Sequence, residues 1–242
     1  ADPVTGVSLS AVHSAAEVIH RCAALTPDGF GNLRFAALAN VSAGSPFLPA
    51  AYHDGGPAMF AIGVESADLA VTACDEAASL ADARARLIRA VEEHARKISQ
   101  LATRLGGQRG LRFGGIDFSL APYPEAARSV GTALERLTGG KVGEAGTLAA
   151  AAFLADSLDH ADLKRAGFSG LFLPMLEDAT LAARAAEGLL TVSDLLLYSS
   201  VCGTGLDTVP LPGDVTIGVL AAILADVSAL ALRLNKPLTA RL

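Results

Sequence analysis

The chain has no tryptophan, and aromatic residues make up only 5% of its 242 positions. Its core therefore has to be built from small and aliphatic side chains, mainly alanine, leucine and valine, within an apolar fraction of 51%. Slender apolar helices of this kind suit packing on both faces of buried strands. A compact chain of 24.6 kDa buries about 70% of its unfolded surface, which allows a sizeable core.

Cysteine is scarce as well. Cys22, Cys74 and Cys202 are odd in number and far apart, and they form neither a CxxC pair nor a zinc-binding spacing. The simplest compartment for such a chain is a reducing cytoplasm. The first residues lack a basic segment followed by an apolar one, so no secretory signal is expected in them.

Positive charge is not in excess, since the chain has 19 lysine and arginine residues and 25 acidic residues, which gives a net charge of −6. A surface for nucleic acid is therefore not expected. Long apolar runs are also missing. The run that begins at Val215 is interrupted by Asp226, well short of the ~20 residues that a membrane span requires. No membrane span is expected.

What is present is an alternation of helical and extended patterns, which is typical of the α/β class. Helical spacing predicts helices over 9–24, 66–78, 80–105, 125–137, 148–158, 177–187, 192–199 and 215–234. Short apolar runs predict strands over 33–39, 58–65, 111–113 and 238–242, with an extended segment over 170–176. Gly106 and Gly107 are expected to end the longest helix, and Asp214 to cap the last one.

The chain is organised around the loop over 199–214. Cys202 is followed there by Gly203 and Gly205, and then by Asp207. Glycine reaches backbone angles that other residues avoid, so the loop is expected to be tight and to admit another chain segment or a ligand closely. A thiolate at Cys202 would be a nucleophile, with a pKa lowered by the N-terminus of the following helix. The alternative is a small, inert, buried side chain.

Other polar residues are candidates for the same site. His53 can serve as a general base or a metal ligand, or as a hydrogen-bond partner of Asp54 in its loop. Asp117 lies in an apolar, strand-like segment, where an unpaired carboxylate is costly, so it should be paired or ligating. Asp207 is positioned after the glycines to orient His53 or a cation.

A divalent metal ion is a further expectation, with Glu177 and Asp178 as its ligands. Together with Asp117, Asp207 and Glu144 these acids could supply an oxygen-rich site. The alternative for Glu177 and Asp178 is a structural one, because acids at a helix N-terminus are favoured by the helix dipole alone.

Several segments resemble an uncharacterised family, domain of unknown function 711. They read NVSAGSPF at 40–47 with AYH at 51–53, GIDFSLAP at 115–122, GT at 146–147, VCGTGLD at 201–207 with PGD at 212–214, and NKPLTAR at 235–241. The resemblance covers about residues 28–242. It implies a barrel similar to that of pyruvate formate-lyase-type glycyl radical enzymes, in which ten strands surround a loop bearing the catalytic cysteine. Cys202 matches that position, but no radical-glycine motif is visible, so glycyl-radical activity is not expected.

The resemblance further implies that residues 1–242 are a single α/β barrel-type domain that lacks the family's N-terminal half and its extreme C-terminus. Unclosed sheet edges favour association, so a homo-oligomer or a complex with the missing segments is expected. Candidate ligand-binding residues within the resembling segments are Asn40, Tyr52, Asp54, Ser119, Gly203 and Gly205.

Two functions follow from these residues. The first is an enzyme that acts on a small polar metabolite with Cys202, His53, Asp117 and Asp207, by thiol or metal-assisted chemistry. The second is a ligand-binding or regulatory protein, or a structural subunit, that keeps the barrel without the reaction, because a fold does not fix a function.

Overall fold

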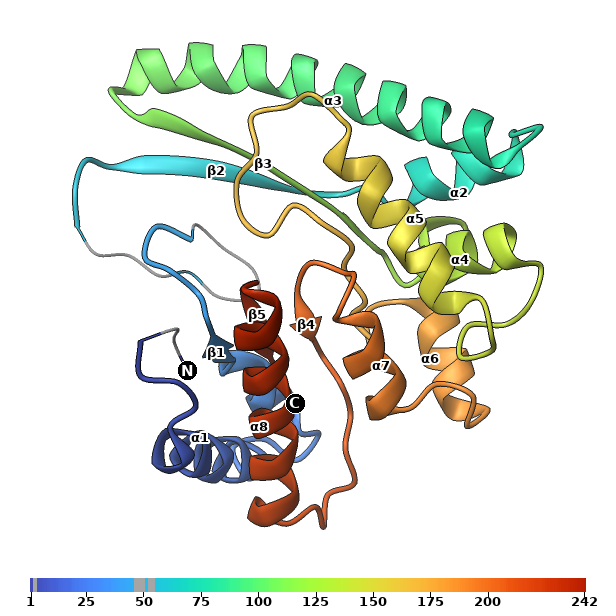
Figure 1. Ribbon diagram of the computed structural model, residues 1–242. Helices are drawn as coiled ribbons and strands as arrows, with labels where there is room; N and C mark the ends of the chain where they lie inside the picture. Colours follow the sequence, from blue (N-terminus) through green and yellow to red (C-terminus); the bar gives the residue numbers. More distant parts are fainter. Residues whose placement is uncertain (2–3, 46–50, 52–54) are drawn as a thin grey trace.

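A computed structural model describes residues 1, 4–45, 51 and 55–242 and shows a mixed α/β fold, as predicted (Figure 1). The described helices are α1 (Leu9–Cys22), η1 (Phe30–Arg34), α2 (Ala67–Asp75), α3 (Leu80–Arg109), η2 (Ala126–Arg128), α4 (Val130–Thr138), α5 (Thr147–Asp159), α6 (Ala179–Ala186), α7 (Val192–Tyr198) and α8 (Ile217–Leu234). The described strands are β1 (Ala37–Ala39), β2 (Met59–Glu65), β3 (Arg112–Ala121), β4 (Gly205–Leu206) and β5 (Leu238–Ala240).

The strands form two small sheets. One has the order β1-β5-β4, with β5 antiparallel to β1 and parallel to β4, and the other is the parallel pair β2-β3. The segment over 164–176, which contains no regular strand although 170–176 was expected to be extended, connects the two sheets. It forms a parallel bridge between Arg165 and Ile116 of β3, and another between Pro174 and Asp207 just after β4. The strands thus follow one another as β2, β3, segment 164–176, β4, β5 and β1.

The predicted barrel is not seen in the described part of the chain. The series of strands is open at β2 and at β1, and regular pairing is interrupted along segment 164–176, where only isolated bridges are formed. A closed barrel needs every strand paired on both sides, and these strands are too few and too short for that. The class predicted from the sequence is therefore right, and the closure is not present here.

The helices cover the strands from the outside (Figure 1). The long helix α3 runs along β3, α2 packs against α3 and α4, and α1 packs against α8, which lies on β5 and β1. Alanine at the contact positions, such as Ala16, Ala70, Ala95 and Ala231, lets these helices approach closely. The core is aliphatic, as expected from the scarcity of aromatic residues.

Three local predictions need correction. Residues 30–34 form the short helix η1 rather than the start of a strand, so that only residues 37–39 pair as β1. Helix α3 continues through Gly106 and ends at Gly110, whose φ of 67° provides the left-handed cap. Helix α8 is capped by Thr216, which accepts a hydrogen bond from the backbone N–H of Val219, and not by Asp214.

Helix α8 is the one described helix that is long and apolar enough to cross a membrane by length and composition. Apolar core helices of soluble proteins meet the same criterion. Here Leu220, Leu224 and Val227 are buried against the rest of the protein, while Asp226 interrupts the apolar surface. The finding is therefore weak evidence for a span.

Candidate functional site

Charged side chains gather where the parallel strands end. Asp207 directly follows β4, Arg241 directly follows β5, and Glu177 follows segment 164–176. Glu65 is the last residue of β2. Ligands of α/β proteins bind outside the carboxyl ends of parallel strands. We call Glu177, Asp207 and Arg241 the carboxyl-edge cluster.

Arg241 is the centre of this cluster. Its Nε lies 2.6 Å from Oδ1 of Asp207 and its Nη2 lies 2.8 Å from Oδ2, so the guanidinium donates to both carboxylate oxygens. Nη2 also lies 3.2 Å from Oε1 of Glu177. Register explains the geometry, since Leu206 pairs with Ala240 and the next residue of each strand is then a neighbour.

The two carboxylates differ in their access to solvent. Asp207 is completely buried, whereas 45% of the Glu177 side chain is exposed. Burial raises the pKa of Asp207, against the opposing effect of Arg241. Burial raises the pKa of Glu177 too, and the negative charges of Asp207 and Glu65 add to this effect while Arg241 opposes it. Glu177 is thus a partly exposed carboxyl with a raised pKa, and it lies near the buried Asp207, which accepts two hydrogen bonds from Arg241. Such an arrangement is suited to proton transfer.

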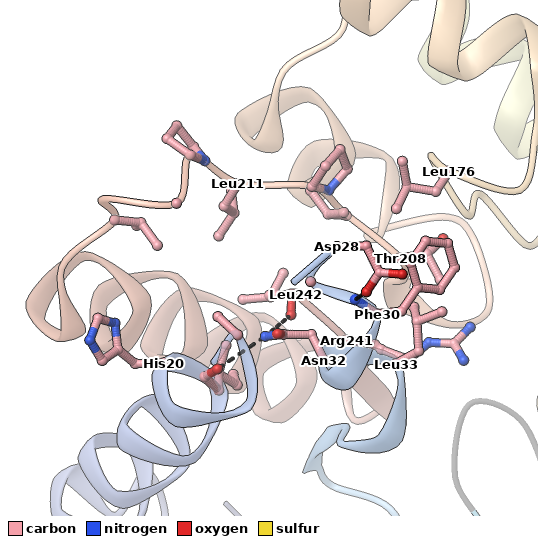
Figure 2. Close-up of a pocket in the computed structure, with 18 of the residues that line it drawn as sticks. His20, Asp28, Phe30, Asn32, Leu33, Leu176, Thr208, Leu211, Arg241 and Leu242 are labelled. Carbon is pink, nitrogen blue, oxygen red and sulfur yellow. Dashed lines mark hydrogen bonds between the residues drawn. The ribbon is translucent and has the colours of Figure 1, made fainter. Parts of the chain in front are cut away.

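A cavity of about 600 Å³ adjoins the cluster (Figure 2). Arg241, Thr208 and Leu176 lie on its wall, and α1, η1 and the start of α8 complete it. Volumes of this size are typical of pockets for small molecules. Arg241 thus belongs to both the cluster and the cavity wall, whereas Glu177 and Asp207 lie behind it and do not line the cavity.

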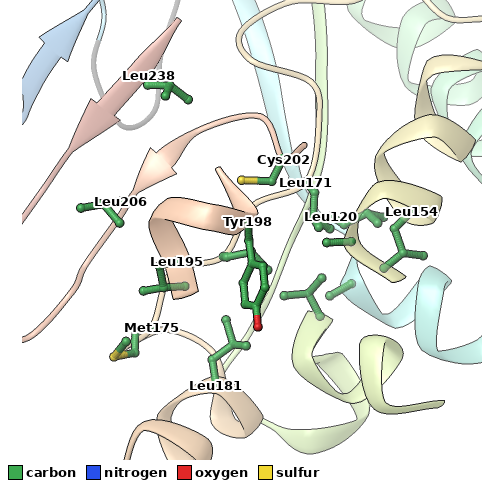
Figure 3. Close-up of a cluster of buried hydrophobic side chains, with 14 of the residues drawn as sticks. Leu120, Leu154, Leu171, Met175, Leu181, Leu195, Tyr198, Cys202, Leu206 and Leu238 are labelled. Carbon is green, nitrogen blue, oxygen red and sulfur yellow. The ribbon is translucent and has the colours of Figure 1, made fainter. Parts of the chain in front are cut away.

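The loop with Cys202 is buried, as its apolar flanks predict. Only 1% of Cys202 is exposed, and its side chain lies beside Leu171 and above Tyr198 in an aliphatic cluster (Figure 3). Burial raises the pKa of the thiol, although Lys236 and the amide groups of Gly205 and Thr204 oppose the shift. The side chain is thus positioned and protonated like a small packing residue.

The glycines of this loop are required by close contacts between chain segments. Gly203 lies against Gly170, and an added Cβ would come within 3.1 Å of the Gly170 Cα. Gly205 has a φ of 96°, and a Cβ there would meet the Thr239 carbonyl oxygen at 2.5 Å. The predicted close approach is therefore made by protein backbone at both positions.

Asp117 is buried and paired, as its apolar setting predicts. It accepts hydrogen bonds from the backbone N–H groups of Phe168 (3.0 Å) and Ser169 (3.1 Å) and from the Ser119 hydroxyl. Ser119 in turn accepts from the Gly170 N–H. Burial nevertheless raises the pKa of Asp117. Both side chains hold the 167–170 turn on β3, and through Gly170 they support the Cys202 loop.

Asp178 has a structural role. It is the N-cap of α6, and its Oδ1 accepts hydrogen bonds from the N–H groups of Thr180 and Leu181 and from the Ser129 hydroxyl. Its Oδ2 accepts from the Gly131 N–H. The oxygens that a metal ion would need are already used in joining α6 to α4.

The expected metal site is not found among the described residues, which contain no group of three or more histidine, cysteine or acidic side chains arranged to hold an ion. Glu144 bonds to the backbone N–H of Lys141, in a turn before α5. Asp117 and Asp207 are held by different partners. The acids predicted to converge thus separate into a turn, a cap and two distinct paired groups.

The remaining candidates divide into two sets. Asn40 lies after β1, with its Nδ2 3.4 Å from Oδ1 of Asn235 and its backbone N–H bonded to the Ala1 carbonyl. Tyr52, His53 and Asp54 lie outside the described residues, so their relation to Asp117 and Cys202 stays a prediction.

Sequence reasoning missed Arg241 and Lys236. Both lie in the segment NKPLTAR, which was recognised only as a resemblance. Lys236 donates to the carbonyls of Ser199, Ser200 and Cys202, at the end of α7. A usable signal was present, because Arg241 interrupts an otherwise apolar strand pattern and a buried cation needs an acidic partner.

Comparisons with known proteins identify a family for this chain. The family model described as "Uncharacterised ACR (DUF711)" matches residues 1–242. The chain belongs to this family. A UPF0210 protein of Pyrobaculum arsenaticum is 37% identical over 251 residues, which cover 100% of this chain and 55% of the relative. UPF0210 protein NMC1568 of Neisseria meningitidis is 31% identical over 245 residues, or 98% of this chain and 54% of the relative. The chain thus spans about half the length of the curated relatives it matches.

Proposed function

We propose that this DUF711 protein is an enzyme that acts on a small polar metabolite, with Glu177 as the group that takes and returns a proton. The observation that carries the proposal is the carboxyl-edge cluster. Asp207 is fixed by two hydrogen bonds from Arg241, while Glu177 shares the same guanidinium and remains partly open to solvent.

These contacts give the three residues of the cluster different roles. The paired Asp207 holds the Arg241 guanidinium in one orientation, so Arg241 in turn positions Glu177. Because the pKa of Glu177 is raised, its protonated form is populated at a higher pH than that of an ordinary glutamate. Proton transfer by a positioned side chain typically contributes about 10²–10⁴-fold to a rate, and it is most efficient when the pKa of that side chain lies near the working pH.

Thiol chemistry at Cys202 would require the loop over 201–207 to open and expose the sulfur. In the closed loop the thiol is buried, and its raised pKa disfavours the nucleophilic thiolate. The acid–base role of Glu177 needs no such opening. For this reason the cluster, and not the cysteine, is the centre of the proposed site.

The complete protein is also proposed to close its sheet. The strands β2, β3, segment 164–176, β4 and β5 are parallel and consecutive in order, and the curated relatives are nearly twice as long as this chain. The rest of such a protein, or a second copy, would cover the open edges at β1 and β2. A barrel like that of the glycyl radical enzymes is the form that the sequence resemblance favours.

The test is a metabolite screen that follows both binding and consumption. The full natural protein is incubated with a chemically diverse set, and Glu177→Gln is compared with Glu93→Gln, which changes an exposed acid of α3. The proposal expects consumption of a metabolite by the wild type and by Glu93→Gln, and at least ~10²-fold slower consumption by Glu177→Gln. Equal rates in all three proteins would remove Glu177 from the reaction.

A ligand-binding or regulatory protein is the second candidate. It is favoured by the cavity, since a pocket of about 600 Å³ beside the cluster can hold a ligand whether or not a reaction follows. In the same screen this candidate expects binding without consumption, and binding that survives in Glu177→Gln.

A further inference from the structure

The cavity beside the carboxyl-edge cluster has an apolar wall and a polar end. Leu33, Leu176, Val209 and Leu220 contribute to its apolar lining, and Arg241 and Thr208 lie where it meets the cluster. The labelled side chains in Figure 2 come from α1, from η1 and the turn before it, from the segments that follow β4 and β5, and from Leu176. A ligand here would have an apolar body and a polar group directed toward Arg241 and Thr208.

Thr208 is unusual in two respects. Its φ is 45°, in the left-handed region that a β-branched residue rarely adopts. The residue is only 2% exposed, and its buried Oγ1 has no hydrogen-bond partner within the described part of the chain. A buried hydroxyl without a partner is costly, and strained residues of this kind cluster at ligand sites. A ligand group that reaches this oxygen would supply the hydrogen bond that it lacks.

The charges at this end select the kind of polar group. Arg241 lies on the cavity wall, but it already donates to Asp207 and Glu177 behind the wall, so its positive charge is offset and its donors are in use. Asp28 places a carboxylate on the cavity wall. Its pKa is lowered by hydrogen bonds from the Thr26 hydroxyl and the Phe30 N–H, so it stays ionised at neutral pH. A carboxylate ligand would be repelled by Asp28 and would find Arg241 already paired, whereas an ammonium group would be attracted by Asp28.

We propose that this cavity binds a small molecule with an apolar body and a cationic amine, the amine lying between Thr208 and Asp28. The proposal rests on the proposed function in one respect, because it assigns the substrate class of that same site. Binding itself does not require the reaction. The Thr208 hydroxyl accepts one hydrogen bond from the amine, and the apolar lining removes the body of the ligand from water.

Three probes of matched size test the charge: 2-phenylethylamine, 2-phenylethanol and 3-phenylpropanoate, each titrated against the full natural protein by calorimetry or saturation-transfer NMR. The amine should bind at least ~10-fold more tightly than the carboxylate, a factor that corresponds to about 1.4 kcal/mol. Equal or tighter binding of the carboxylate, or no binding of the amine at millimolar concentration, overturns the proposal.

Two pairs of variants locate the site. Ala24→Trp places a large ring in the cavity from an exposed position, and Ala85→Trp makes the same change on the exposed face of α3. Asp28→Asn removes a charge while keeping the acceptor for Phe30, and Asp68→Asn is its surface control. Amine affinity should fall ~10-fold in Ala24→Trp and about 3-fold or more in Asp28→Asn, with both controls unchanged. Unchanged affinity in Ala24→Trp places the amine elsewhere and refutes the site.

The two proposals fail separately. Glu177→Gln should abolish consumption of the metabolite while the amine probe still binds, since Glu177 does not line the cavity. Loss of the amine preference with Glu177-dependent turnover intact would refute the substrate class alone. Amine binding at the cavity in a protein that consumes nothing would refute the reaction alone.

Discussion

Arg241 and Asp207 are joined by two hydrogen bonds, 2.6 Å from Nε to Oδ1 and 2.8 Å from Nη2 to Oδ2, across the ends of two neighbouring parallel strands. Asp207 is fully buried, so its negative charge depends on this one arginine. The pair fixes the end of β5 against the end of β4. It also orients the guanidinium that reaches Glu177.

Arg241→Ala should therefore be strongly destabilising. Removing one partner of a buried ion pair leaves an uncompensated charge and typically costs about 3–5 kcal/mol of unfolding free energy. The exposed Arg233→Ala on α8 is the control and should change stability by less than ~0.5 kcal/mol. Denaturant unfolding measures both.

The double variant Asp207→Ala/Arg241→Ala separates pairing from packing. Once both charges are gone, no buried charge is left unpaired, so the double variant should be more stable than the sum of the single effects predicts, by about 1–3 kcal/mol. Additive costs would show that the two side chains act independently.

Asp178 gives a prediction that distinguishes a cap from a metal ligand. Asp178→Ala should cost at least about 1–2 kcal/mol, because α6 loses its N-cap and the amide of Gly131 loses its acceptor. Asp178→Asn keeps an oxygen that accepts from Thr180 and Leu181, so its stability should lie between that of Asp178→Ala and that of the wild type. Thermal unfolding in the presence of a chelator provides the measurement, and an alanine variant as stable as the wild type contradicts the cap.

Much of the helical framework is readable from the sequence, because apolar spacing and the caps at Ser8, Ser79 and Thr191 depend on local chemistry alone. The strands are harder to predict. Segment 164–176 has a strand-like pattern only in part, and its bridges to Ile116 and Asp207 depend on residues far away in the chain. Closure of the sheet is not a local property either, so the resemblance suggested a barrel that these residues do not complete.

The candidate site shows the same limit. The sequence singled out Asp207 as an acid after the loop glycines and Glu177 as a metal ligand; the structure brings both beside Arg241, and their roles stay predictions. The sequence did not reveal that Arg241 joins them, since that contact comes from the parallel register of β4 and β5. Cys202 stood out because cysteine is rare and lies among glycines, but the same small residues also suit a tightly packed crossing of backbone segments.

The thiols provide a direct check on Cys202. In the native protein Cys202 should react with a disulfide reagent only as fast as the protein unfolds, because it is 1% exposed. Cys22 and Cys74 are both partly accessible, and burial raises the pKa of Cys74 to about 11, so Cys22 should react first. Cys202→Ala should leave the number of fast-reacting thiols unchanged, and loss of a fast thiol in this variant would indicate an open loop.

Glu177→Gln should lower activity without lowering stability. The folded protein raises the pKa of Glu177, so its protonated form is favoured by folding. That stabilisation is present below the unfolded pKa and is lost as the pH rises through the folded pKa. At neutral pH the glutamine variant, which carries no charge to bury, should have an unfolding temperature equal to or above that of the wild type. A clear decrease would mean that Glu177 serves chiefly to hold the fold.

The central claim is that Glu177 is tuned for proton transfer, and its own titration tests this without knowledge of the substrate. The side-chain carboxyl is followed by ¹³C NMR in the full natural protein and assigned by its absence in Glu177→Gln. The account predicts a midpoint above the ordinary glutamate value of 4.5, and a lower midpoint in Asp207→Asn, where one repelling charge is gone. A midpoint at or below 4.5 in the wild type would contradict the account.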